Sequence, residues 1–123
     1  MPTRRLVLAA LFAAVATAAP AQGKKGASDL APALNIAGSY HSFGRNPDGS
    51  SYEGVVQIAQ DGSIVGFTWR IGNDSYSGEG LIDGRIVAVD WGAASPVVYV
   101  VMPDGELHGT WDDGLGLEKL TPN

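Results

Sequence analysis

From Ile36 onward, short runs of alternating apolar and polar residues are separated by turn-forming residues at intervals of about 10–12 positions, a spacing typical of all-β sandwiches and barrels. Every connection is short, so each strand should pair antiparallel with the next in an up-and-down meander. About eight such strands can close as a barrel and remove both sheet edges, with a flattened sandwich as the alternative. The predicted strands cover residues 38–43, 52–60, 63–71, 75–82, 85–91, 97–102, 106–112 and 115–121.

A weak internal repeat supports this all-β prediction. The segments 61–69 (DGSIVGFTW), 83–91 (DGRIVAVDW) and 104–111 (DGELHGTW) each begin with an Asp-Gly turn and end in tryptophan. Asp-Gly supplies the positive φ angles of tight hairpin turns. The third copy is one residue shorter, and a three-residue loop of Pro103, Asp104 and Gly105 would restore its phase. The repeat therefore describes hairpins of one closed sheet.

Steps of two residues counted back from each tryptophan assign the two faces of the sheet. The predicted core face carries Val65, Phe67, Trp69, Ile71, Val87, Val89, Trp91, Leu107, Gly109 and Trp111, joined by Tyr40, Val56, Ile58, Tyr76, Leu81 or Ile82, Leu115 and Leu117. The predicted solvent face carries Glu53, Gln57, Thr68, Arg70, Asp90, Glu106, His108 and Thr110. The segment 97–102 is apolar on both faces, so it is either covered by the N-terminal leader or exposed as a contact patch.

The three tryptophans that end the repeats should gather at one end of the barrel, because alternate strands of a meander run in the same direction. Trp69, Trp91 and Trp111, with Tyr40 as a fourth member, are the candidate ligand-binding residues. An eight-stranded barrel has room for packed side chains or for one small ligand. The indoles would then either form a stacking platform for a flat ligand or peptide, or plug the barrel end and complete the core.

The N-terminus has the pattern of a secretory signal peptide. Arg4 and Arg5 precede the uncharged run 6–19, and Ala19-Pro20-Ala21 provides small residues for cleavage after Ala21. The apolar run is too short for a spanning helix. We therefore predict a signal peptide over residues 1–21, a flexible leader over 22–36 and a barrel domain over 37–123. With no cysteine for a lipid anchor or disulfide, the product should be periplasmic or secreted and free of a membrane anchor.

Charge and motifs exclude several functions. The formal charge is −5, and removal of residues 1–21 leaves 6 basic and 13 acidic residues, or −7, which argues against nucleic-acid partners. No nucleophile motif occurs, His41 and His108 fall on the solvent face, and Asn46, Asp48 and Ser50 do not fit a calcium loop. We therefore expect no catalytic residue, metal or cofactor. The predicted function is non-enzymatic binding of a small ligand or extracellular partner; an envelope or matrix interaction module is the alternative, and a hydrolase or isomerase a remote one.

Two family resemblances bear on these expectations. The short antiparallel strands with Gly-x-Trp or Gly-x-Tyr endings resemble the avidin-like and wider calycin barrels in architecture. Residues 38–122 look similar to small exported proteobacterial proteins of unknown role, some labelled fibronectin-binding-like, through GSY, NPDGSSYEGVVQI, SGEGLIDG, VDWG and GLEKLTPN. The second resemblance spans the whole domain and implies an adhesive role, but it supplies no catalytic residue.

Overall fold

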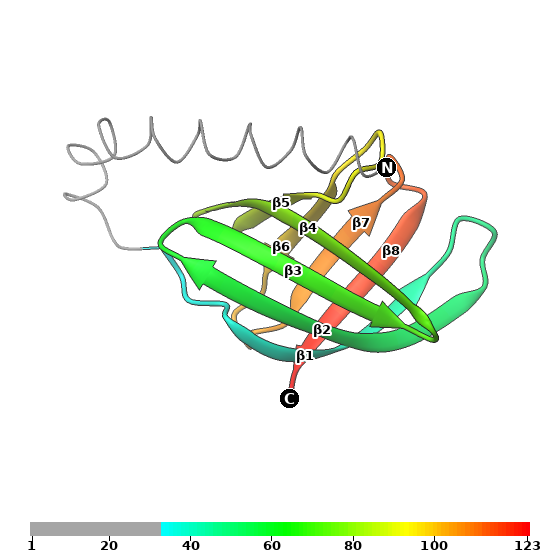
Figure 1. The fold of residues 1–123 in the computed structure, drawn as a ribbon, viewed down its shortest axis with the longest axis horizontal. Helices are drawn as coiled ribbons and strands as arrows, with labels where there is room; N and C mark the ends of the chain where they lie inside the picture. The colour runs from blue at the N-terminus through cyan, green and yellow to red at the C-terminus, as the bar shows by residue number, and fades with distance from the viewer. Residues whose placement is uncertain (1–32) are drawn as a thin grey trace.

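Residues 33–123 form an all-β domain in the computed structural model, which describes this part of the chain (Figure 1). The predicted signal peptide and most of the predicted leader lie outside the described residues. The strands are β1 (Gly38–Arg45), β2 (Ser51–Asp61), β3 (Ile64–Ile71), β4 (Asp74–Asp83), β5 (Ile86–Asp90), β6 (Val97–Val101), β7 (Leu107–Trp111) and β8 (Gly116–Pro122).

The sheet closes on itself as an up-and-down barrel. Each strand pairs antiparallel with the next, and β8 returns to pair with β1, with Tyr40 opposite Pro122 and Arg45 opposite Leu117. Closure satisfies the backbone groups that an open sheet would leave at its two edges. The barrel predicted from the sequence is therefore confirmed, and the flattened sandwich is not formed.

The hairpin turns keep this order but differ from the expected Asp-Gly turns by one residue. Asp61 pairs with Ile64 and Asp83 pairs with Ile86, so each Asp is the last residue of its strand. The central turn residues are Gly62-Ser63 and Gly84-Arg85, with φ values of 63° and 60° at the two glycines. A positive φ at the first central residue alone is the type II′ arrangement, for which glycine is favoured.

The three-residue loop predicted before β7 is present. The Met102 amide donates to the Glu106 carbonyl (2.7 Å), which leaves Pro103, Asp104 and Gly105 as the loop. The same arrangement recurs between β1 and β2, where the Asn46 amide donates to the Ser50 carbonyl (2.7 Å). In this way a Pro-Asp-Gly sequence sets the register of two hairpins.

The interior contains the side chains that alternation predicts for most strands. Val56, Val65, Val87, Val89, Leu107 and Leu120 are fully buried, and Phe67 stacks on Tyr99 with ring centroids 5.4 Å apart. Ile82 is buried and Leu81 is exposed, which decides the alternative left open in β4. In β6, Tyr99 points inward, while Val100 on the outer face is exposed.

Leu115 and Leu117 were expected in the core, and that expectation is wrong. They are 66% and 53% exposed. The β7–β8 loop spans residues 112–115, and Trp111 pairs with Gly116. This register turns Gly116, Glu118 and Leu120 inward, so Leu117 faces out. The length of the β7–β8 loop therefore fixes which side chains of β8 face inward, although Leu117 is apolar and Glu118 is charged.

The two ends of the barrel differ. We call the end formed by loops 46–50, 72–73, 91–96 and 112–115 the mouth, and the opposite end the base. Ile36 is buried at the base, where its amide donates to Gln60 Oε1 (2.7 Å) and its carbonyl accepts from the Tyr40 hydroxyl (2.7 Å). Packed structure thus begins slightly before position 37, and this segment closes the base.

Within residues 33–123 there is no helix with the length and hydropathy needed to cross a bilayer.

Candidate functional site

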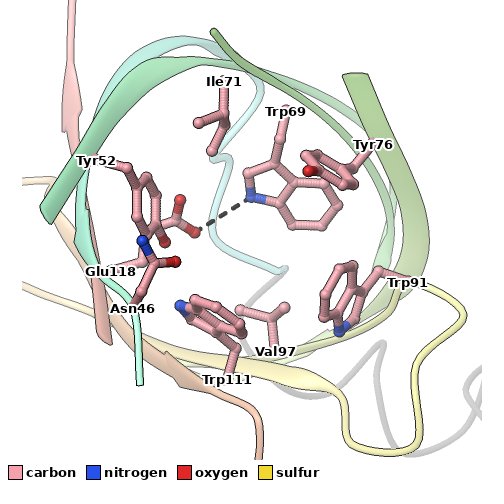
Figure 2. Close-up of a pocket in the computed structure, with 9 residues that line it drawn as sticks. All are labelled: Asn46, Tyr52, Trp69, Ile71, Tyr76, Trp91, Val97, Trp111 and Glu118. Carbon is pink, nitrogen blue, oxygen red and sulfur yellow. Dashed lines mark hydrogen bonds between the residues drawn. The ribbon is translucent and has the colours of Figure 1, made fainter. Parts of the chain in front are cut away.

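Trp69, Trp91 and Trp111 line one cavity at the mouth (Figure 2). They lie near the end of β3, directly after β5 and at the end of β7, three strands that run in the same direction. Trp69 is buried, whereas the other two indoles are partly buried. Tyr40, the fourth candidate, lies away from this cavity and bonds to Ile36 at the base. The structure therefore brings three of the four candidate residues together.

The cavity has a volume of about 350 Å³, near the lower end of the usual range for ligand pockets. Its lining is mostly aromatic and aliphatic, with few polar groups. Besides the three tryptophans, it contains Asn46, Tyr52, Ile71, Tyr76, Val97 and Glu118. Figure 2 shows these side chains pointing from the surrounding strands and loops toward a common central space.

A buried carboxylate lies among these aromatic rings. Glu118 is 5% exposed, and its Oε1 accepts hydrogen bonds from the Tyr99 hydroxyl (2.6 Å) and Trp69 Nε1 (3.2 Å). Oε2 accepts from the Ser42 hydroxyl (2.6 Å). These three neutral donors come from β1, β3 and β6, so they hold the carboxylate from several sides of the barrel. A buried carboxyl group is tolerated only with such partners.

The tyrosines near this carboxylate hold their protons more tightly than usual. Burial, and then the negative charge of Glu118, raise the pKa of Tyr99 well above its ordinary value of 10.0. The same two causes raise the pKa of Tyr52. Desolvation disfavours the charged form of a tyrosine, and a nearby negative charge does so too. Both phenols are therefore neutral hydrogen-bonding groups at physiological pH.

Four rings form an arc around the mouth. Tyr52 contacts Trp111, Trp111 contacts Trp91, and Trp91 contacts Tyr76, at centroid distances of 6.3, 6.1 and 6.1 Å. The interplanar angles are 65°, 88° and 75°. Edge-to-face pairs of this kind are favourable aromatic contacts. Neighbouring rings are therefore steeply inclined to one another and are not stacked face to face.

Glycines opposite two of these rings make room for them. Gly44 pairs with Tyr52 and Gly116 pairs with Trp111 across neighbouring strands. A Cβ added at either glycine would overlap the ring of its partner. Each ring therefore lies over the backbone of the adjacent strand, as when an aromatic residue covers a strand glycine. The glycines are part of the construction of the site.

The tryptophans are fixed in different ways. Trp91 Nε1 donates to the Ser95 carbonyl (3.0 Å), and Trp69 Nε1 donates to the Tyr99 hydroxyl (3.1 Å) and Glu118. Trp111 Nε1 is buried and makes no hydrogen bond of good geometry among the described residues, although it lies near enough to the Tyr52 hydroxyl to oppose the rise in the pKa of that phenol. Its indole is therefore positioned by packing against Tyr52, Trp91 and the glycine backbone of β8.

Sequence analysis did not identify Tyr52 or Glu118 as site residues. Tyr52 lies at the start of a polar stretch of β2. Glu118 directly follows Leu117, and the apolar character of Leu115 and Leu117 favoured an inward orientation for these leucines. The signal that could have revealed Glu118 was the equal spacing of Gly116, Glu118 and Leu120, because the orientation of any one of them fixes the others.

The histidines lie outside the barrel, as the alternation predicted. His41 Nε2 is 3.6 Å from Glu53, and His108 Nε2 is 2.8 Å from Glu106. Side chains of both histidines are about half exposed, so the pairs contribute little to stability. In the part of the chain that the structure describes, no group of three or more His, Asp or Glu side chains is placed to hold a metal ion.

Comparison with models of known protein families and with curated protein sequences finds no match for this chain.

Proposed function

We propose that this protein is an exported, non-catalytic binding protein that takes a small ligand into the cavity at the mouth of its barrel. The observation that carries the proposal is an aromatic-walled cavity of about 350 Å³ with a buried carboxylate in its lining. Apolar and aromatic walls with a few placed polar groups are the usual features of ligand pockets.

Binding is favoured over catalysis by the chemistry of the cavity. Its titratable side chains are Tyr52, Tyr76 and Glu118. The raised pKa of Tyr52 keeps this phenol protonated near neutral pH, so it is a poor general base there. His41 and His108 are on the outer surface, away from the lining. The cavity therefore offers mainly recognition groups: a phenol that stays protonated and a carboxylate that already accepts three hydrogen bonds.

The tryptophans provide a direct test of the site. We expect a bound ligand to change intrinsic tryptophan fluorescence and to raise the unfolding midpoint, because a ligand that binds the folded state stabilises it by about 2.7 kcal/mol at a hundred times its Kd. Trp91→Leu and Trp111→Leu should abolish both responses. Tyr40→Phe is the matched control, since Tyr40 lies at the base, and it should bind as the wild type does. A panel of small apolar, aromatic and cationic molecules that produces neither response would refute the proposal.

The export part of the proposal is supported by residues 1–21 of the sequence. N-terminal sequencing of the protein recovered from outside the cytoplasm should give a chain that begins at Gln22. Recovery only from the cytoplasm, with Met1 or Pro2 as the first residue, would contradict it.

A further inference from the structure

The carboxyl group of Glu118 is buried without an opposite charge nearby. Within residues 33–123, the pairs of a basic and an acidic side chain closer than 4.0 Å are His41 with Glu53 and His108 with Glu106, and neither involves Glu118. The neighbouring Lys119 points to the outer face of β8. Hydrogen bonds from Ser42, Tyr99 and Trp69 offset part of the cost of burying a carboxylate, but they are neutral. The cavity lining therefore carries a negative charge with no protein counter-charge.

The aromatic arc offers a second attraction for a cation. The faces of tryptophan and tyrosine rings carry negative electrostatic potential, and a cation within about 6 Å of a ring centroid is attracted to it. Tyr52, Trp111, Trp91 and Tyr76 stand around the mouth at 65–88° to their neighbours. Trp69 adds a ring next to Glu118, as Figure 2 shows. A cation in the cavity is thus near several rings and one carboxylate.

The mouth also carries excess negative charge. Asp48, Asp112 and Asp113 belong to its loops, and Asp74 and Asp90 lie at the adjoining strand ends. Arg45 and Arg70 are the basic residues nearest these loops in the sequence, and both are exposed on outward-facing positions. A negative field around an opening raises the local concentration of cations and their rate of entry.

The hydrogen-bonding capacity of the cavity decides which kind of cation fits. A primary ammonium group has three N–H donors that need acceptors when they leave water. Glu118 already accepts three hydrogen bonds, and Ile71, Val97 and the indoles supply no acceptor. The other acceptors in the lining are the Asn46 amide oxygen and the hydroxyls of Tyr52 and Tyr76, and the rest of the wall is aromatic and aliphatic. A quaternary ammonium group has no N–H donor, so it needs only the opposite charge and the ring faces.

We propose that the cavity binds a small, free quaternary ammonium ion, with Glu118 as counter-charge and Tyr52, Trp91 and Trp111 as aromatic walls. This inference rests on the proposed function of the cavity as a ligand site, and it names the chemical class of the ligand.

The test is isothermal titration of the purified protein with choline, with its uncharged isostere 3,3-dimethylbutan-1-ol, and with ethanolamine. Choline should bind at least about tenfold more tightly than either of the other two, a factor equivalent to about 1.4 kcal/mol. Glu118→Gln preserves the size of the side chain, and its amide can donate to the Ser42 hydroxyl while its carbonyl accepts from Tyr99. This variant should lose the preference for choline over the isostere.

The wild-type comparison distinguishes this inference from the proposed function without relying on any variant. Equal binding of choline and its isostere would overturn the quaternary ammonium proposal and leave a ligand site. Tighter binding of ethanolamine would overturn it as well. If none of the three binds and the wider panel also fails, both proposals are refuted.

A trimethylammonium group also occurs on phosphatidylcholine, so the source of the ligand needs its own measurement. The protein should not co-sediment with phosphatidylcholine vesicles whose headgroup concentration equals the concentration of free choline that saturates the protein. Co-sedimentation with vesicles in the absence of choline binding would overturn the assignment to a free ion.

Discussion

Replacing Trp69 and Trp91 singly by alanine separates the part of the mouth that holds the fold together from the part that is open to a ligand. Trp69 is only 4% exposed and donates hydrogen bonds to Tyr99 and Glu118. A tryptophan side chain buries about 150–250 Å². We therefore expect Trp69→Ala to cost about 3–5 kcal/mol, as truncation of a buried aromatic does.

Trp91 is partly exposed at the edge of the cavity, so its truncation returns less apolar area to water. Trp91→Ala should cost roughly half as much, about 1.5–2.5 kcal/mol. A domain of this size has a stability of about 5–15 kcal/mol, so the Trp91 variant should stay folded while the Trp69 variant is severely weakened.

Urea unfolding followed by far-ultraviolet circular dichroism measures both free energies without depending on tryptophan emission. The slope of free energy against urea must be the same for the two variants if the comparison is to hold. Equal losses of unfolding free energy for Trp69→Ala and Trp91→Ala would show that the indole of Trp91 is as buried as that of Trp69. The cavity would then be collapsed in solution, and the reasoning for an open mouth would be refuted.

Three further predictions follow from individual contacts. Gly116→Ala should displace the indole of Trp111 and weaken choline binding by about tenfold or more. Gly66→Ala, where an added Cβ meets nothing within 4 Å, should bind choline as the wild type does. Equal choline affinities for the two variants would contradict the packing role of Gly116. Burial and then the charge of Glu118 raise the pKa of Tyr99 in the folded state, so the stability that Tyr99 contributes should be complete below about pH 10 and lost as the pH rises above that value toward the folded pKa. The free energy of unfolding, measured between about pH 8 and about pH 11, should therefore fall less steeply in Tyr99→Phe than in the wild type. An unchanged slope would exclude Tyr99 as the titrating group. Val100→Lys, on the outer face of β6, should change the free energy of unfolding by no more than about 0.5 kcal/mol. Val87→Lys, in the core, should prevent folding. Unfolding of the Val100 variant would place that side of β6 in the core.

The closed meander could be predicted from the sequence because local signals agree along most of the chain. Turn glycines fall where strands end, and the alternation in β3 and β5 places Phe67, Trp69, Val87 and Val89 on one face. Loop chemistry also specified register correctly before β7, where Pro-Asp-Gly forms a three-residue loop. In these segments the hydrophobic period of each strand and the type of the adjoining turn direct the same side chains into the core.

The candidate site could be predicted only in part, because its polar half depends on the register of β8. The tryptophans were found because they end strands that run in the same direction. Glu118 was missed because its orientation is decided by a four-residue connection in which Asp112 and Asp113 adopt φ values of 51° and 57°. Non-glycine residues seldom adopt such angles, although aspartate tolerates them better than most. Local propensity therefore predicted a turn here but did not give its length.

Sequence alternation placed Tyr40 correctly on the inner face, but its grouping with the tryptophans was wrong, because Tyr40 lies near the start of β1 and Trp69 lies near the end of β3, which runs in the same direction. Its hydroxyl bonds to the Ile36 carbonyl, a contact made by the segment that precedes β1. That segment has no period of its own, so its packing at the base emerges only in three dimensions.

Both ends of the described chain lie at the base, away from the mouth. Ile36 is packed there, and Asn123 at the C-terminus bonds to the backbone and side chain of Ser39. The C-terminus is consequently a suitable point for covalent attachment: a linker joined at Asn123 would anchor the barrel to a sensor chip or resin with its aromatic opening turned toward the bulk solution. Because the sheet has no free edge, neighbouring molecules immobilised in this orientation would have no exposed strand through which to pair.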